Sequence, residues 1–169
     1  QSCGLCVVEC PAKVISFKTP LEDCGRDTLE AVFQEKFIQD INPLIINFYC
    51  QYSAYNEEKA DTIDNVLFSH VRRVGVLGLG KVDPSLYLRA FELGAHGVMV
   101  TACKDDICHF CKDREWVERR TKFTSRLLGG LGIEPGRLRT HFVSSQNGKE
   151  ILDLAFTMVE DLKNLQTIT

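Results

Sequence analysis

Eight cysteines stand out in this chain of 169 residues, because six of them fall into two tight clusters. One cluster lies within residues 3–10 and the other within residues 103–111. Closely spaced thiolates are ligands for soft metals, above all zinc and the iron of iron–sulfur clusters. Disulfide frameworks of secreted proteins usually occur in shorter chains without a large apolar core, whereas 44% of this chain is hydrophobic. The cysteine pattern therefore favours metal or redox chemistry over structural disulfides.

The N-terminal cluster consists of Cys3, Cys6 and Cys10, with Pro11 directly after it. This spacing matches the last three cysteines of the run C-x2-C-x2-C-x3-C-P, in which bacterial ferredoxins hold 4Fe-4S clusters. The first cysteine of that run would fall before Gln1. We therefore expect Cys3, Cys6 and Cys10 to form an incomplete 4Fe-4S ligand set, in a chain that is part of a longer electron-transfer protein.

The second cluster has the spacing Cys103-x4-Cys108-x2-Cys111. Plant-type ferredoxins use the same spacing, together with one remote cysteine, to hold a 2Fe-2S cluster. Cys50 is a candidate for the remote ligand, although a buried cysteine often only packs, which is the reading we favour for Cys24. A structural zinc site built on Cys108 and Cys111 is the alternative for this loop.

Buried-strand patterns alternate with helical patterns along most of the chain, which predicts a parallel sheet covered on both faces. The expected fold is α/β, a small doubly wound, flavodoxin-like parallel sheet of about four strands. The expected strands are residues 44–49, 74–77, 97–101 and 138–143, and the expected helices are residues 85–93, 113–128 and 149–165.

Three segments are expected from this pattern. Residues 1–18 are the end of a ferredoxin module, and residues 19–41 are a connector with one short helix. Residues 42–169 form the α/β domain. Within that domain the carboxyl ends of parallel strands meet at one edge of the sheet. Cys50, the glycine turn at residues 78–80 and the cysteines of residues 103–111 each follow a strand. We therefore predict a metal site there, made by Cys50, Cys103, Cys108 and Cys111.

Composition excludes some classes of function. The net charge of −3 gives no electrostatic reason to expect nucleic acid as a partner. No apolar run approaches the roughly 18 residues that a membrane-spanning helix needs. The glycine turn at residues 78–80 lacks the later glycine of a dinucleotide-binding fingerprint. No nucleophile and base are required by this interpretation, so we expect no catalytic residues and an electron carrier rather than a self-contained enzyme.

Five stretches of the chain occur together, in order, in a known family. They are residues 47–55 (NFYCQYSAY), 80–84 (GKVDP), 90–100 (AFELGAHGVMV), 102–110 (ACKDDICHF) and 132–135 (GIEP). By these stretches, residues 45–165 resemble the delta (iron–sulfur) subunit of methyl-viologen-reducing hydrogenase. A ferredoxin end in front of such a domain is similar to heterodisulfide reductase A-like flavoproteins, including the B subunit of the quinone-interacting membrane-bound oxidoreductase.

The resemblance implies a 2Fe-2S cluster that relays electrons between a heterodisulfide reductase A-like flavoprotein and a partner subunit. Flavin is then expected only in that flavoprotein or in a missing region. Implied partners are hydrogenase, formate dehydrogenase or quinone-linked oxidoreductase subunits, in the cytoplasm or at the inner face of a membrane. The chain keeps the family's cysteines at Cys50, Cys103 and Cys108, and Cys111 is additional. It departs from the family at Tyr49, Ser53 and Gly78, where the family has cysteine.

Those departures leave two interpretations of the α/β domain open. In the first, Cys111 completes a rearranged four-cysteine cluster site. In the second, the domain has lost its cluster, or holds only zinc, and docks a partner subunit without redox chemistry of its own. A flavodoxin-like flavin domain is a third, weaker hypothesis, because the segment after the first strand is not rich in serine and threonine.

Overall fold

The computed structural model describes most of the region expected to form the α/β domain, and short pieces of the segment before it. The described residues are 6, 10–12, 14–15, 24–36, 38–52, 70–104, 108, 113–143 and 148–165. Of the expected ferredoxin segment, only residues 6, 10–12 and 14–15 are described. The 4Fe-4S ligands expected there therefore stay a prediction.

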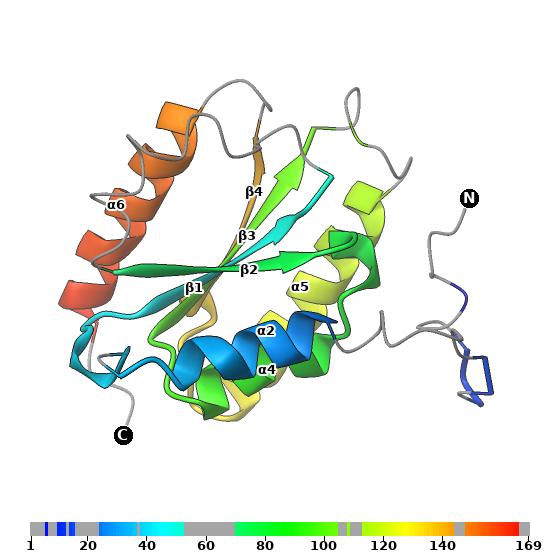
Figure 1. The fold of residues 1–169 in the computed structure, drawn as a ribbon, viewed down its shortest axis with the longest axis horizontal. Helices are drawn as coiled ribbons and strands as arrows, with labels where there is room; N and C mark the ends of the chain where they lie inside the picture. Colours follow the sequence, from blue (N-terminus) through cyan, green and yellow to red (C-terminus); the bar gives the residue numbers. More distant parts are fainter. Residues whose placement is uncertain are drawn as a thin grey trace.

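A four-stranded, all-parallel sheet forms the centre of the molecule, with the strand order β2-β1-β3-β4 (Figure 1). Its strands are β1 (Ile45–Cys50), β2 (Val71–Val76), β3 (Gly97–Cys103) and β4 (Leu138–Val143). In the register, Phe48 of β1 lies between Val74 of β2 and Val100 of β3. The fold expected from the sequence is therefore confirmed.

The second strand begins earlier than its apolar run predicts. The buried run starts at Val74, but β2 starts at Val71 and includes Arg72 and Arg73, which are only partly buried. Both arginines lie on a strand that has just one neighbour in the described sheet. Long arginine stems can cover a sheet edge while their guanidinium groups reach polar partners, and Arg72 pairs with Glu35 at 2.9 Å.

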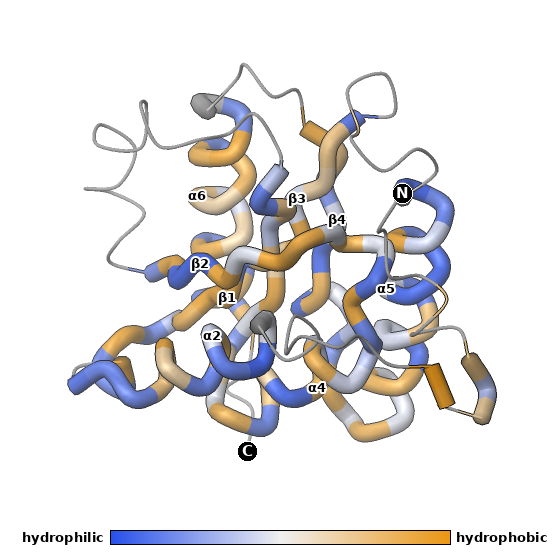
Figure 2. Tube along the Cα trace, turned by 45° about the vertical axis from the view of Figure 1, so that its right-hand side comes forward, coloured by the Kyte–Doolittle hydropathy of each residue, from blue (hydrophilic) through white to orange (hydrophobic). Residues whose placement is uncertain are grey.

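Helices cover both faces of the sheet (Figure 1). Helices α2 (Cys24–Phe33), α4 (Pro84–Glu92) and α5 (Asp113–Gly130) lie on one face, and α6 (Gly148–Asn164) lies on the other. Hydrophobic residues predominate in β1 and β3, the two central strands, whereas the edge strand β2 begins with a hydrophilic stretch (Figure 2). Helix α2 contributes Leu29 and Val32 to the core of its face. The short helix expected in the connector thus packs onto the α/β domain.

Two separate apolar cores follow from this two-sided arrangement. One lies between the sheet and α2, α4 and α5, where the rings of Phe48 and Tyr87 meet edge to face with centroids 5.2 Å apart. The other lies between the sheet and α6 and includes Met99 and Met158. Residues that alternate along a strand contribute to opposite cores, as a pleated strand requires.

Helix α4 shows how local sequence sets the element boundaries. The Asp83 side chain accepts a hydrogen bond from the backbone N–H of Ser85 at 2.8 Å, and Pro84 occupies the first helical position. The turn after the helix contains Gly94 at φ 110°, a left-handed conformation that glycine adopts without strain. Three short 3-10 helices complete the described elements: η1 (Ile38–Asp40), η3 (Leu79–Lys81) and η5 (Pro135–Arg137).

A partly buried polar network, which we call the polar lock, joins the amino ends of β1, β3 and β4. The backbone N–H of Leu44 donates to Nδ1 of His96 at 3.1 Å. Arg137, only 2% exposed, donates to the carbonyl oxygen of His96 at 3.1 Å and pairs with Glu134 at 2.6 Å. Nδ1 of His96 must carry no proton to accept this hydrogen bond, so the imidazole is neutral. Burial, and then the Arg137 charge, lower the pKa of His96 below its ordinary value.

No helix within the described ranges is both long enough and apolar enough to cross a membrane.

This lock generates a prediction about stability and pH. The unfolded chain binds a proton at His96 near pH 6.5, whereas the folded chain binds it only at lower pH, so the free energy of unfolding should fall as pH drops from 7 towards 5.5. His141, whose pKa burial and then Arg139 also lower, contributes in the same direction. Denaturant titrations of wild type and His96→Asn measure this dependence. The variant should lose less stability over this range, and an equal loss would contradict the assignment.

Candidate functional site

Within the described sheet, β1 and β3 are the neighbouring strands whose following connections leave the carboxyl edge in opposite directions. β1 pairs with β3 although β2 lies between them in the sequence. The connection from β1 therefore goes to one side of the sheet, and the connections after β3 go to the other. Such a switch point is where doubly wound folds bind their ligands. Cys50 is the last residue of β1 and Cys103 is the last residue of β3, so both flank it.

Cys50 lies in the apolar core on the face covered by α2, α4 and α5. Its exposed fraction is 6%. Its Sγ lies 3.9 Å from the carbonyl oxygen of Leu77, directly after β2, and donates a weak hydrogen bond to it. The next residue is Gly78, one of the positions where the resembling family has cysteine. The ends of β1 and β2 thus meet at the Cys50 thiol, as the sequence predicts.

Cys103 reaches the same edge from the other side of the switch point. Its backbone is in register with Val143 of β4, and it is half-buried. Residues 98, 100 and 102 of β3 contribute to the core that contains Cys50, whereas Met99 contributes to the α6 core. By this alternation Cys103 belongs to the α6 face. Cys50 and Cys103 thus lie on opposite faces of the sheet, and a metal ion bound by both thiols would have to lie beyond the strand ends.

The described residues include three of the four predicted thiolates. Cys108 follows β3 in the same loop and is half-buried, while Cys111 lies outside the described residues. Among those described, no three His, Cys, Asp or Glu side chains form a group that could hold a metal ion. The four-cysteine site thus remains a prediction that the backbone arrangement permits.

Two of the three N-terminal cysteines lie among the described residues. Cys6 is exposed and Cys10 is half-buried, whereas Cys3 lies outside the described residues. Cys24 begins helix α2. These positions leave both the ferredoxin ligand set and the packing role expected for Cys24 as predictions.

The glycine turn after β2 serves packing. Leu79 and Gly80 are buried within η3. Val82, directly after η3, accepts a hydrogen bond from the buried Arg120 of α5 at 2.9 Å. The turn and the residue after it thus anchor α5 to the sheet. This packing role explains the sequence of the turn without a bound phosphate.

Sequence reasoning missed a stacked pair on the α6 face. The guanidinium carbon of Arg73 lies 4.3 Å from the ring centroid of Tyr49, a cation–π contact. Gly75 makes room for it, because a Cβ there would lie 3.1 Å from the Tyr49 hydroxyl oxygen. Tyr49 occupies another position where the family has cysteine, and here it has a packed role of its own. In the sequence, the only indication of this contact was the pair Arg72 and Arg73 directly ahead of an apolar run.

A second missed feature is a buried polar pair beside the switch point. The hydroxyl of Thr101 donates to Oδ1 of Asn47 at 3.0 Å, and both side chains are less than 5% exposed. They join β1 to β3 just ahead of Cys103. Buried polar groups are costly unless they are paired, so this bond holds the two cysteine-bearing strands in register. An asparagine within an otherwise apolar strand was the signal in the sequence.

The donor set suits an iron–sulfur cluster or zinc. Cysteine thiolates are the ligands that both metals prefer, and the described edge brings Cys50 and Cys103 to neighbouring strand ends with Cys108 in the following loop. These residue types at this edge are the ones that a soft metal would require, and metal binding itself stays a prediction.

Comparison with known proteins agrees with this chemistry. Residues 45–166 match the family model of the methyl-viologen-reducing hydrogenase delta subunit. The iron-sulfur D subunit of the F420-non-reducing hydrogenase vhu of Methanococcus maripaludis is 32% identical over 73% of this chain and 92% of its own. The corresponding protein of Methanocaldococcus jannaschii is 30% identical over 74% of this chain and 94% of its own.

A larger relative matches over a similar part of the chain. The A subunit of the ferredoxin/F420H2-dependent CoB-CoM heterodisulfide reductase of Methanosarcina acetivorans is 24% identical over 75% of this chain, which spans only 16% of that protein's length. The matching region thus makes up nearly all of some relatives and a small part of others. Since the family model covers the whole described sheet with α4, α5 and α6, this chain belongs to the methyl-viologen-reducing hydrogenase delta subunit family.

Proposed function

We propose that this domain is the electron-transfer component of a multi-subunit oxidoreductase, with a 2Fe-2S cluster held by Cys50, Cys103, Cys108 and Cys111. The observation that carries the proposal is the arrangement of Cys50 and Cys103 on either side of the β1/β3 switch point. Cys108 and Cys111 follow Cys103 with the spacing of plant-type cluster ligands.

A cluster at this edge would accept and release single electrons. The chain's own contribution is to fix the thiolates and to shield them from water. Cys50 is enclosed by the apolar core, and the Asn47–Thr101 hydrogen bond joins the two strands that carry Cys50 and Cys103. Burial and hydrogen bonds to sulfur set the potential of such clusters. The proposed partners are a heterodisulfide reductase A-like flavoprotein region and a hydrogenase, formate dehydrogenase or quinone-linked oxidoreductase subunit.

The names of the relatives support this proposal. Those that match over most of their length are called iron-sulfur subunits of a hydrogenase, and the larger one is part of a heterodisulfide reductase. Both names describe oxidoreductases that are built from several subunits. Electron relay through this domain, together with a 4Fe-4S cluster near Cys3, Cys6 and Cys10, is the function that fits both groups of relatives.

One observation favours a second candidate, a docking domain without a cluster of its own. Tyr49 and Gly78 stand where the resembling family has cysteine, and Tyr49 is packed under Arg73. Cys50 itself is buried and donates to a backbone carbonyl. In this alternative the cysteines of the edge pack or bind zinc, and the redox chemistry lies elsewhere in the complex.

The burial of the thiols predicts the order in which they react. In metal-free, folded protein, N-ethylmaleimide should modify Cys103 and Cys108 well before Cys50, because Cys50 is only 6% exposed. Anaerobic reconstitution with iron and sulfide should then protect all three together. Peptide mass spectrometry measures both results. Protection of Cys108 without Cys50 would contradict a shared site.

Substitution of the ligands gives the test of the proposed function. In a Cys3→Ser/Cys6→Ser/Cys10→Ser background, which excludes iron bound by the N-terminal thiols, Cys103→Ser and Cys108→Ser should each abolish the visible absorption and iron content of the reconstituted protein, because a serine hydroxyl is a poor ligand for cluster iron. Cys24→Ser is the matched control, since Cys24 lies in α2 and outside the proposed set, and should keep both. Thermal melting of each variant checks the fold. Full iron content in folded Cys108→Ser would contradict the proposal, and zinc in place of iron would favour the docking domain.

A further inference from the structure

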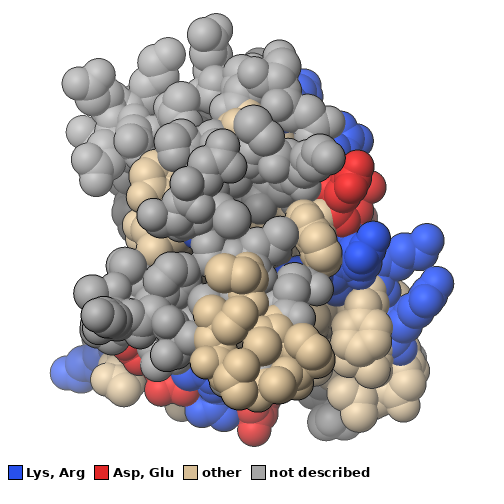
Figure 3. Space-filling view, turned by 90° about the vertical axis from the view of Figure 1, so that its right-hand side faces the viewer, with Lys and Arg blue, Asp and Glu red and all other residues tan. Residues whose placement is uncertain are grey.

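The last two thirds of helix α5 are positively charged, in contrast to the chain as a whole. Residues 119–130 contain four arginine or lysine residues and no aspartate or glutamate. The acidic residues of α5 lie in its first turns, where the helix dipole favours them. The chain as a whole has a net charge of −3. Lys and Arg side chains gather at the right of Figure 3, on the side where α5 lies.

An exposed apolar row runs beside these cations. Phe123, Leu127 and Leu131 are spaced four residues apart and are 51%, 38% and 69% exposed. Residues four apart lie on the same side of a helix. Lys122 and Arg126 have the same spacing and form the adjacent row. Thr124 and Leu128, on the other side of α5, are fully buried. The exposed rows are therefore additional to the contacts that hold the helix in the fold.

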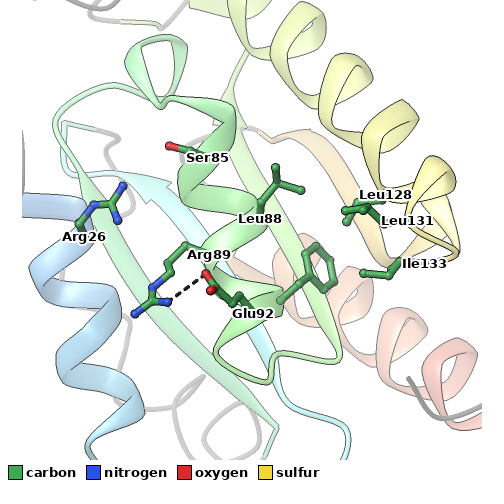
Figure 4. A pocket seen from close by; sticks show the side chains of 9 residues that line it. Arg26, Ser85, Leu88, Arg89, Glu92, Leu128, Leu131 and Ile133 are labelled. Atoms are coloured by element: carbon green, nitrogen blue, oxygen red, sulfur yellow. Dashed lines mark ion pairs between the residues drawn. The ribbon is translucent and has the colours of Figure 1, made fainter. Parts of the chain in front are cut away.

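The apolar row continues into a groove (Figure 4). The groove has a volume of about 460 Å³ and lies between α4 and the end of α5. Its apolar wall is formed by Leu88, Phe91, Leu128, Leu131 and Ile133. Leu131 belongs to both the groove and the exposed row, which makes them one surface. We call this surface, from Lys122 to Leu131 with the groove, the α5 face.

The cations of the two parts differ in how they are neutralised. Arg89, at the groove, pairs with Glu92 at 2.9 Å and with Glu30 at 3.4 Å. Lys122 and Arg126 make no ion pair with any residue that the structure describes. Their charges are available to a partner, and the exposed apolar row beside them offers the area that such a partner would bury.

The α5 face is distant from the cysteine edge. Helix α5 starts after Cys108 and runs back along the sheet, so at 1.5 Å per residue Phe123 lies roughly 15 Å beyond the start of the helix. Binding there leaves the switch point uncovered. Contact with the subunit that holds the domain in place can thus be separated from the exchange of electrons.

We propose that the α5 face docks an acidic, partly apolar surface of another subunit of the oxidoreductase. That the partner is an oxidoreductase subunit rests on the proposed function. That its surface is acidic follows from the charges of the α5 face. Carboxylates would pair with Lys122 and Arg126, and an apolar side chain would cover Phe123 and enter the groove next to Leu131. The matching region makes up 92% of one relative and 16% of another. Where it is a nearly complete chain, only noncovalent contacts can hold it to other subunits.

The experiment uses the protein as its host produces it, purified through an affinity tag at low ionic strength with the subunits that accompany it. A water-soluble carbodiimide joins lysine amines to carboxylates without a spacer, and therefore only where they touch. Mass spectrometry of the coupled peptides should find Lys122 joined to an aspartate or glutamate of an oxidoreductase subunit. Lys163 on α6, exposed and paired with Glu160 at 3.2 Å, is the matched control and should couple only within its own chain.

Variants then measure the contribution of each row. Lys122→Glu combined with Arg126→Glu, and separately Phe123→Ser, should each lower the retained partner by about tenfold, as for residues near the centre of an interface. Phe156→Ser is the matched control, because Phe156 on α6 is 49% exposed, and it should retain the partner. Added salt should weaken binding of the wild type, since exposed charges are screened.

Each other outcome overturns the inference. Coupling of Lys122 to a second copy of this chain would make the α5 face a homodimer contact. Binding of the wild type, but not of Lys122→Glu/Arg126→Glu, to vesicles of anionic lipid without any coupled subunit would make it a membrane contact. Full partner retention by both α5 variants would place docking elsewhere. Iron content, measured in the same samples, reports separately on the proposed function, because the α5 face contains no cysteine.

Discussion

The pairing of β1 with β3 is the interaction on which the rest of the structure depends. Since β2 lies between these strands in the sequence but on the far side of β1 in the sheet, the chain must reverse direction across the sheet there. Phe48 and Val100 meet in this pair and anchor the larger core, and the buried Asn47–Thr101 hydrogen bond holds it in register. The same reversal brings Cys50 and Cys103, distant in sequence, to adjacent strand ends.

The arrangement separates two tasks within a small domain. The carboxyl edge carries the thiols and is continuous with the core through Cys50, so this proposed ligand is held by the packing that stabilises the fold. Helix α5 carries charge and exposed apolar area away from that edge. A partner bound to α5 would leave the edge open to a second partner, which is what an electron relay between two subunits requires.

Much of the fold could be predicted because each strand carries its own local signal. The run from Ile45 to Cys50 is buried on both faces, and Asp83-Pro84 marks the start of α4. The start of β2 was missed because Arg72 and Arg73 hide an edge strand from a search for apolar runs. The placement of Cys50 and Cys103 at the carboxyl edge of the sheet could be predicted from the order of parallel strands alone. The faces of the sheet to which Cys50 and Cys103 belong, and the stacking of Arg73 on Tyr49, depend on register and on contacts between distant residues, which no local pattern contains.

The measurement that tests the central claim most directly is iron and acid-labile sulfide analysis, with electron paramagnetic resonance, of the anaerobically reconstituted chain. The account predicts a reducible signal of a 2Fe-2S cluster, with about two iron and two sulfide per chain assigned to the α/β domain. The triple variant Cys3→Ser/Cys6→Ser/Cys10→Ser, which removes the N-terminal thiols, should keep that signal. Folded protein of this variant without iron would contradict the claim that the switch-point cysteines form an electron-transfer site.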